Sequence, residues 1–301
     1  MIPLASPFHP DNERAYVAWR AAKLARFPQR LSDLVVEVRD PRALAPAERA
    51  AIVERCRVAN MAIYASRCTA ADKDIPRRLG AQLGLARLDR NLLADEDGIT
   101  SLAVSDAPQP KGEYIPYTSR PLKWHTDGYY NPAERLIRAV ILHCVERAEE
   151  GGENAVLDHE LAYLLLRDAD PEHIHALTED DAMTIPPRMD EHGVARPAVT
   201  GPVFSVDPLG GALHMRYTAR TRSIAWKESH ATLAAARRLG EILHGPSPRI
   251  FRLRLEPGMG FVSNNVLHNR SAFTDSAARR RLIYRARYCD RIAGTQIAEA
   301  A

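Results

Sequence analysis

The chain has 301 residues, 46% of them hydrophobic, which is enough to bury a large core within one domain. Its 41 Lys and Arg nearly balance its 38 Asp and Glu, and the net charge of +3 excludes the global positive field of a general nucleic-acid-binding protein. Four scattered cysteines without a CxxC pair exclude a zinc knuckle and a dense disulfide framework.

The first part of the chain, residues 1–97, is predicted to be rich in helix. Asp11 or Asn12 can cap a helix that runs to about Arg26, and Pro46 suits the first turn of a second helix. Capping residues and apolar runs together predict helices at about 11–26, 45–60 and 75–83, and strands at 34–38 and 61–65.

The N-terminus lacks the basic stretch and apolar run of a secretory signal. No segment approaches the roughly 20 apolar residues that a membrane span requires. We therefore expect a cytoplasmic protein without a membrane partner.

From about Gly98 the sequence changes to short β-prone runs separated by Gly and Pro turns, a spacing typical of a jelly roll. We expect an α+β fold with a mainly β core, a double-stranded β-helix (jelly roll) with flanking helices. A single domain would span 1–301, with its core at 98–290. Further helices are predicted at 160–168, 171–177 and 229–243.

One strand and turn stand out late in the chain. The run Ile250–Leu255 alternates apolar and basic residues, as a half-buried strand does. Glu256-Pro257-Gly258 supplies a tight turn, so the strand that returns should begin near Phe261.

The segment from Trp124 to Gly128 carries an imidazole and a carboxylate two positions apart, at His125 and Asp127. On a strand both side chains point the same way, so both can reach one metal ion. His268, which follows the predicted turn, is the candidate third ligand. Two histidines and one carboxylate leave three positions of an octahedral metal open, which suits the iron(II) of oxygenases.

A lone HxD pair is more often structural than metal-binding, because such pairs are common by chance. The combination with a downstream histidine and an arginine-rich strand carries the hypothesis. In that strand Arg281, Ile283, Arg285 and Arg287 alternate with apolar and aromatic residues. Arginines facing a core need an anionic partner, since a buried unpaired guanidinium is strongly disfavoured. The alternative for the neighbouring arginines is a solvated basic face.

These motifs resemble the taurine dioxygenase and γ-butyrobetaine hydroxylase family of 2-oxoglutarate-dependent oxygenases. The resemblance rests on WHTDG, the Gly151-Gly152-Glu153-Asn154 turn, SNNVLHNR and RRLIYRARY. It implies iron(II), 2-oxoglutarate and O2, with His125, Asp127 and His268 as the catalytic metal ligands. Matched position by position, the resemblance also implies three contacts with 2-oxoglutarate. Arg285 would anchor its distal carboxylate, Arg281 would support Arg285, and Asn154 would make a further contact.

Substrate signals point in two directions. Arg216 and Arg220 lie in a cationic segment that resembles the family's substrate-proximal region, which favours an anionic substrate. The tyrosines Tyr129, Tyr130 and Tyr217 could instead cage a quaternary ammonium group. Packing and surface ion pairs are the alternatives for both sets.

We therefore expect an iron(II)- and 2-oxoglutarate-dependent oxygenase that hydroxylates a small polar molecule, either amino-acid-like, betaine-like, or a sulfonate or carboxylate. The competing hypothesis is a non-catalytic jelly-roll metal-binding or sensor protein, whose metal would have a filled coordination shell. The balanced charge disfavours a nucleic-acid demethylase. The expected partner is a small-molecule substrate, and a homo-oligomer is left open.

Overall fold

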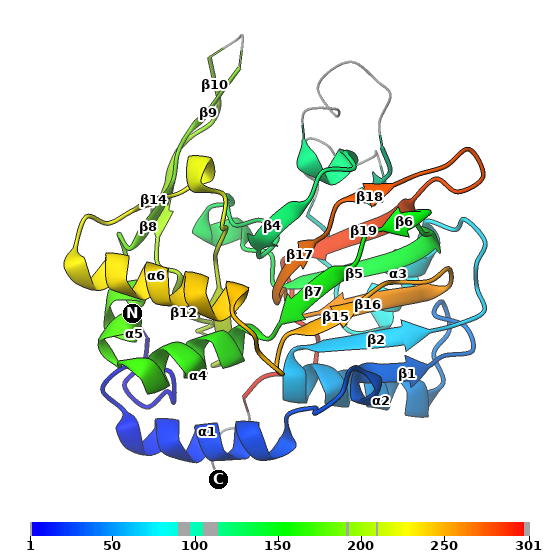
Figure 1. The fold of residues 1–301 in the computed structure, drawn as a ribbon. Helices are drawn as coiled ribbons and strands as arrows, with labels where there is room; N and C mark the ends of the chain where they lie inside the picture. Colours follow the sequence, from blue (N-terminus) through cyan, green and yellow to red (C-terminus); the bar gives the residue numbers. More distant parts are fainter. Residues whose placement is uncertain (1, 90–96, 105–113, 191–192, 209, 298–301) are drawn as a thin grey trace.

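The computed structural model of the chain describes residues 2–89, 97–104, 114–190, 193–208 and 210–297 (Figure 1). Its centre consists of two sheets. The larger has six strands, in the order β1 (Val35–Glu37), β2 (Met61–Ala65), β16 (Met259–Ser263), β5 (Ala139–Glu146), β19 (Leu282–Tyr288) and β3 (Thr100–Leu102). The smaller has four, in the order β15 (Phe251–Leu253), β7 (Asn154–Leu157), β17 (Leu267–Arg270) and β4 (Leu122–His125).

The chain crosses repeatedly between these two sheets. It passes from β4 to β5 and back to β7, and later from β15 to β16, then to β17 and β19. All neighbouring strands are antiparallel except β1 and β2, which are parallel. Two antiparallel sheets linked by crossing connections form the jelly-roll architecture predicted from the sequence.

One core lies between the sheets and a second lies behind the larger one. The first combines Ile63, Phe261 and Ile283 from the larger sheet with Val156 and Leu267 from the smaller. The second lies where α2 (Pro46–Ala59) and α3 (Asp74–Gln82) contact the larger sheet. Successive side chains of a strand point to opposite faces, so β19 supplies both cores.

The other helices pack beside the sheets (Figure 1). These are α1 (Glu13–Arg26), α4 (His159–Ala169), α5 (Glu172–Thr178) and α6 (His230–His244), and α4, α5 and α6 contact one another. The predicted helices are confirmed to within about two residues at each end. Asn12 caps α1 by accepting a hydrogen bond from the backbone N–H of Ala15, as its residue type predicts.

Shorter elements complete the fold. The remaining strands are β6 (Glu150–Gly151), β8 (Met183–Ile185), β9 (Arg188–Asp190), β10 (Gly193–Arg196), β11 (Val199–Gly201), β12 (Phe204–Val206), β13 (Leu213–Met215), β14 (Ala225–Trp226) and β18 (Phe273–Thr274). Short 3-10 helices lie at η1 (Leu31–Leu34), η3 (Ile115–Tyr117), η4 (Ala133–Arg135) and η5 (Thr221–Ser223). Among the described residues, no helix has the length and apolarity to cross a membrane.

The turn at residues 256–258 has a different role from the one that its sequence suggests. Gly258 adopts φ +86°, as a tight turn requires. The strands on either side of it do not pair with each other, because β15 pairs with β7 whereas β16 pairs with β2 and β5. The turn therefore passes the chain from one sheet to the other.

Candidate metal centre

The smaller sheet brings two histidines together at one end. His125 is the last residue of β4 and His268 lies in β17, and the two are direct partners in the antiparallel pairing. Directly opposite residues project from the same face of a sheet. The imidazole centroids lie 4.2 Å apart, and His125 is buried.

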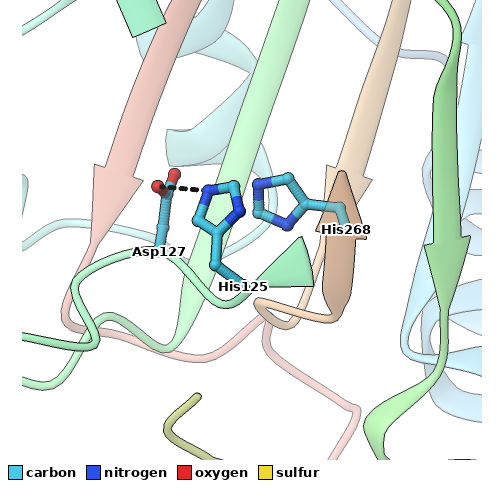
Figure 2. A group of neighbouring side chains, drawn as sticks. All are labelled: His125, Asp127 and His268. Carbon is cyan, nitrogen blue, oxygen red and sulfur yellow. Dashed lines mark ion pairs between the residues drawn. The ribbon is translucent and has the colours of Figure 1, made fainter. Parts of the chain in front are cut away.

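Asp127 completes the group predicted from the sequence. The side chains of His125, Asp127 and His268 converge (Figure 2). Each offers one ligand atom, and these atoms all lie within 4.8 Å of one another. The His125 Nε2 lies 3.9 Å from Asp127 Oδ1. Two imidazoles and one carboxylate on one side of a site fit the facial arrangement of a non-haem iron(II) centre.

The ring orientation of both histidines is set by the backbone. His125 Nδ1 lies 2.9 Å from the carbonyl oxygen of Lys123, and His268 Nδ1 lies 3.0 Å from that of Val266. A carbonyl oxygen only accepts, so each Nδ1 carries the proton and donates it. Each Nε2 then keeps a lone pair for a metal, which is the second-shell arrangement typical of metal-binding histidines.

The loop after β4 is held by an asparagine just before β17. The Asn265 side chain accepts from the Asp127 N–H at 2.7 Å and donates to the Asp127 carbonyl at 2.9 Å. Asn265 adopts φ +55°, a left-handed conformation that asparagine tolerates better than most residues. Gly128 adopts φ +67°, and a Cβ there would lie 2.3 Å from Ile137 Cγ1. These contacts fix where the carboxylate of Asp127 points.

The electrostatic environment keeps the triad in the protonation state that a metal needs. Burial, together with the neighbouring His268, lowers the pKa of His125 to about 3. Burial alone would raise the pKa of Asp127, but Arg285 and Arg287 outweigh it and hold that pKa well below its usual range. At neutral pH the site therefore offers a neutral imidazole and a carboxylate.

The predicted 2-oxoglutarate contacts separate into two places. Arg285 Nη1 lies 3.2 Å from Asp127 Oδ1, so this arginine sits at the metal centre itself. Arg281 and Asn154 line a small cavity nearer the other end of β19, together with Gly152, Arg254 and Ile283. Arg281 is 7% exposed, and its Nη1 has no hydrogen-bond partner within the described residues. Burial lowers its pKa to about 10, so it remains charged at neutral pH.

The alternation predicted for β19 is confirmed. Arg281, Arg285 and Arg287 are all buried, with Ile283 in the core between the sheets, while Tyr284 and Ala286 join the core behind the larger sheet.

The predicted substrate residues divide by what they contact. Tyr129 lies edge-on to His125 with centroids 6.4 Å apart, and Tyr130 lies edge-on to Tyr129. The Tyr130 hydroxyl accepts from Arg287 at 2.9 Å, and Arg287 also pairs with buried Asp89. These two tyrosines therefore border the metal centre.

The segment from 216 to 220 runs beside β4, because Thr218 forms a bridge with His125. Arg216 is not free to bind a substrate anion, since its guanidinium donates to carbonyl oxygens of Met183, Val199, Gly201 and Pro202. These bonds tie neighbouring strands together, so its contacts favour a structural role over the substrate role expected from its position in a cationic segment. Tyr217 is buried against Trp226, and Arg220 is half-buried.

Two functional features were not predicted. Asn265 was visible only as part of an Asn-Asn pair before the third ligand, and its contact with Asp127 spans 138 positions. The second is the hairpin β9–β10, in which Arg196 lies over Tyr130 and its strand partner Arg188 lies over Tyr114. Arg196 and Arg188 carried no local motif, so nothing near them in the sequence indicated their position.

Comparison with known proteins identifies the family. Residues 71–287 match the model of the family described as "Taurine catabolism dioxygenase TauD, TfdA family". The chain belongs to this family. The resemblance seen in the sequence is confirmed, and the expected chemistry of iron(II), 2-oxoglutarate and O2 is that of the family.

Individual members of the family differ from this chain in sequence. It is 32% identical over 180 residues to a uridine-5'-phosphate dioxygenase from a Streptomyces species, covering 56% of this chain and 62% of that protein. Its fold matches an asparagine oxygenase solved with Fe(II), 3-hydroxyasparagine and succinate (TM-score 0.58, 15% identity, 93% of this chain and 85% of the other). It also matches a taurine dioxygenase from Burkholderia xenovorans (TM-score 0.55, 18% identity, 85% and 88%).

Proposed function

We propose that this chain is an iron(II)- and 2-oxoglutarate-dependent oxygenase that oxidises a small polar substrate, with His125, Asp127 and His268 as its metal ligands. The observation that carries the proposal is the convergence of one ligand atom from each of two imidazoles and a carboxylate within 4.8 Å, while both Nδ1 atoms donate to backbone carbonyls. A structural metal site would instead be expected to supply four protein ligands. Within the described residues the group has three.

The protein's own residues would orient the reactants and protect the site. Iron(II) with 2-oxoglutarate and dioxygen supplies the oxidising chemistry when bound. Asn265 and Gly128 hold Asp127 in place, and Arg285 keeps its carboxylate ionised. The rings of Tyr129 and Tyr130, which follow Asp127 in the chain, line one side of the metal centre and would limit the access of water to it.

The distal carboxylate of 2-oxoglutarate would lie against Arg281. The sequence predicts Arg285 as this anchor and Arg281 as its support, but the contacts favour the reverse. Arg285 already has an anionic partner in Asp127. Among the described residues the guanidinium of Arg281, which lies beside Asn154, has no acidic partner, and its buried Nη1 has no hydrogen-bond partner. A planar guanidinium binds a carboxylate in bidentate fashion, which would satisfy that nitrogen.

The substrate is proposed to carry an anionic group. The similarity to a uridine-5'-phosphate dioxygenase adds nucleoside phosphates to the carboxylates, sulfonates and betaines expected from the sequence. Arg220, at the end of the segment beside β4, has no acidic partner among the described residues and is compatible with such a group.

Succinate formation tests the proposal. Purified protein is supplied anaerobically with iron(II), ascorbate and 2-oxoglutarate, then exposed to air with uridine 5'-phosphate, taurine, asparagine or γ-butyrobetaine. We expect substrate-stimulated succinate with one of these classes, and its loss in Asp127→Ala and His268→Ala. The matched control is His230→Ala, an exposed histidine at the start of α6, which should retain activity. Metal binding without any 2-oxoglutarate turnover would favour the non-catalytic binding or sensor protein.

A further inference from the structure

Two arginines face each other at the base of the β9–β10 hairpin, which projects from the body as an arm (Figure 1). Arg188 of β9 and Arg196 of β10 are direct partners in the antiparallel pairing. Directly opposite residues have Cβ atoms about 4.5 to 5.5 Å apart, and like charges in that position destabilise the pair. A hairpin that places two guanidiniums together therefore needs something to offset their repulsion.

The pairing of these arginines depends on a local irregularity in the hairpin. The regular register pairs Gly193 with Asp190 and Val194 with Met189, and would place Ala195 opposite Arg188. The register shifts between Val194 and Arg196, so that Arg196 takes that position instead. A bulge of this kind adds one residue to a strand and re-aims the side chains that follow it. Here it moves Arg196 onto the face of Arg188.

No acidic side chain compensates these two charges within the described part of the chain. Arg196 donates only to the carbonyl oxygens of Pro186 and Pro197, at 2.6 and 2.8 Å. A guanidinium has five N–H donors, so three of them remain for a ligand. The side chain of Arg188 makes no hydrogen bond or ion pair among the described residues, and its guanidinium lies 4.5 Å from the centroid of Tyr114.

Two tyrosines lie between Arg196 and the metal centre. The guanidinium of Arg196 lies 5.8 Å from the centroid of Tyr130, which contacts Tyr129, which in turn lies edge-on to His125. Burial and the proximity of Arg188 lower the pKa of Arg196, whereas Tyr129 and Tyr130 raise it. Each guanidinium lies against an aromatic ring, Arg188 on Tyr114 and Arg196 on Tyr130. These ring contacts do not remove the repulsion between the two like charges.

We propose that Arg188 and Arg196 form the subsite that binds a phosphate or similar tetrahedral oxyanion of the primary substrate. This inference rests on the proposed function for the identity of the site, and adds the class of substrate and the residues that select it. An oxyanion between the two guanidiniums would accept bidentate hydrogen bonds from each and would remove their mutual repulsion. The bulge and the two tyrosines would hold the arginines ready for it.

Arginine footprinting tests this subsite without requiring turnover. The iron(II)- and 2-oxoglutarate-loaded protein is kept anaerobic and labelled with phenylglyoxal, with and without inorganic phosphate, and the labelled residues are quantified by mass spectrometry. Phosphate should slow the labelling of Arg188 and Arg196 several-fold. It should leave Arg237, an exposed arginine on α6, unaffected. Equal labelling rates with and without phosphate would overturn the proposal, even if the chain proves to be an oxygenase.

Matched variants then assign the anion to the substrate. Arg188→Gln and Arg196→Gln should each raise KM for a phosphorylated substrate about 10- to 100-fold with kcat little changed, as expected for loss of a hydrogen bond to a charged group. KM for the same molecule without its phosphate should not change, and Arg237→Gln should behave as wild type. Phosphate protection without a KM change would contradict the substrate role. Failure of the proposed function would instead appear as no turnover in the wild type.

Discussion

Arg285 of β19 and Arg281, which directly precedes this strand, are both buried but have different surroundings. Arg285 contacts the carboxylate of Asp127, so its charge is compensated within the protein. Arg281 is equally buried and lacks an acidic hydrogen-bond partner for its Nη1. A buried guanidinium without a partner is costly, and this cost would be relieved only when a carboxylate binds.

We therefore predict that Arg281→Ala weakens 2-oxoglutarate binding more than Arg285→Ala does. Removing one partner of a buried charge pair costs roughly 2 to 5 kcal/mol, which raises the dissociation constant about 30-fold or more. Asn154→Ala should have a smaller effect, because a neutral hydrogen bond contributes about 0.5 to 1.5 kcal/mol.

Isothermal titration of the manganese-loaded proteins with 2-oxoglutarate measures these affinities without turnover. Arg279→Ala removes a half-exposed arginine paired with Glu149 and serves as the control. If Arg285→Ala proves the more damaging change, the assignment of the anchor from the sequence alone was the correct one.

Single residues differ in how far the sequence reveals them. The metal ligands follow from residue type, a spacing of two positions on a strand, and the family resemblance. The role of Asn265 could not be predicted, because it depends on a left-handed backbone conformation and on a contact with a residue 138 positions away. The surroundings of Arg216 were hidden for a related reason: only the fold shows that carbonyl oxygens surround its guanidinium.

At the scale of elements, a buried ion cluster joins three helices. Lys23 of α1 lies 2.5 Å from both Asp158 and Glu160, at the start of α4, and donates to the carbonyl of Val58 in α2. Burial would raise the pKa of Glu160, but Lys23 outweighs it and lowers that pKa below its usual 4.5. A depressed carboxyl pKa means that the stabilisation is present above about pH 4.5 and is lost as pH falls further.

Glu160→Gln should consequently destabilise the protein most at neutral pH. Breaking a buried ion pair costs about 3 kcal/mol or more. This difference from wild type should shrink at about pH 3.5, because there the carboxyl group is mostly protonated in the unfolded chain but still ionised in the folded protein. The pKa of Lys23 is raised, so Lys23 stays charged throughout this range. Urea denaturation at the two pH values measures the difference. Glu228→Gln, at an exposed position, should show none. A pH-independent difference would mean that Glu160 stabilises the protein through packing.

Elements with local signals were predictable, whereas their partners were not. Asn12 and Pro46 mark helix starts by local chemistry, and both helices were located. The turn at Gly258 was also located, but the same turn chemistry serves a hairpin or a crossing between sheets. Strand pairing depends on contacts between distant parts of the chain, which local sequence does not encode.

At the scale of the whole molecule, the two sheets bring the three ligands together from distant parts of the chain. β4 and β17 pair directly in the smaller sheet, and β19 brings its arginines from the larger one to the same place. The sequence predicted this architecture through the resemblance to its family, since spacing alone could not show that His125 and His268 are partners.

Anaerobic titration of 2-oxoglutarate into the iron(II)-loaded protein tests the central claim most directly. Chelation of iron(II) by 2-oxoglutarate produces a visible metal-to-ligand charge-transfer absorbance, which requires open positions on a metal held by few protein ligands. We predict that the band saturates at one 2-oxoglutarate per chain in the wild type and in His230→Ala, and that it is lost in His268→Ala. The absence of the band in iron-loaded wild type, or its full development in folded His268→Ala, would contradict the assignment of this triad as the iron centre.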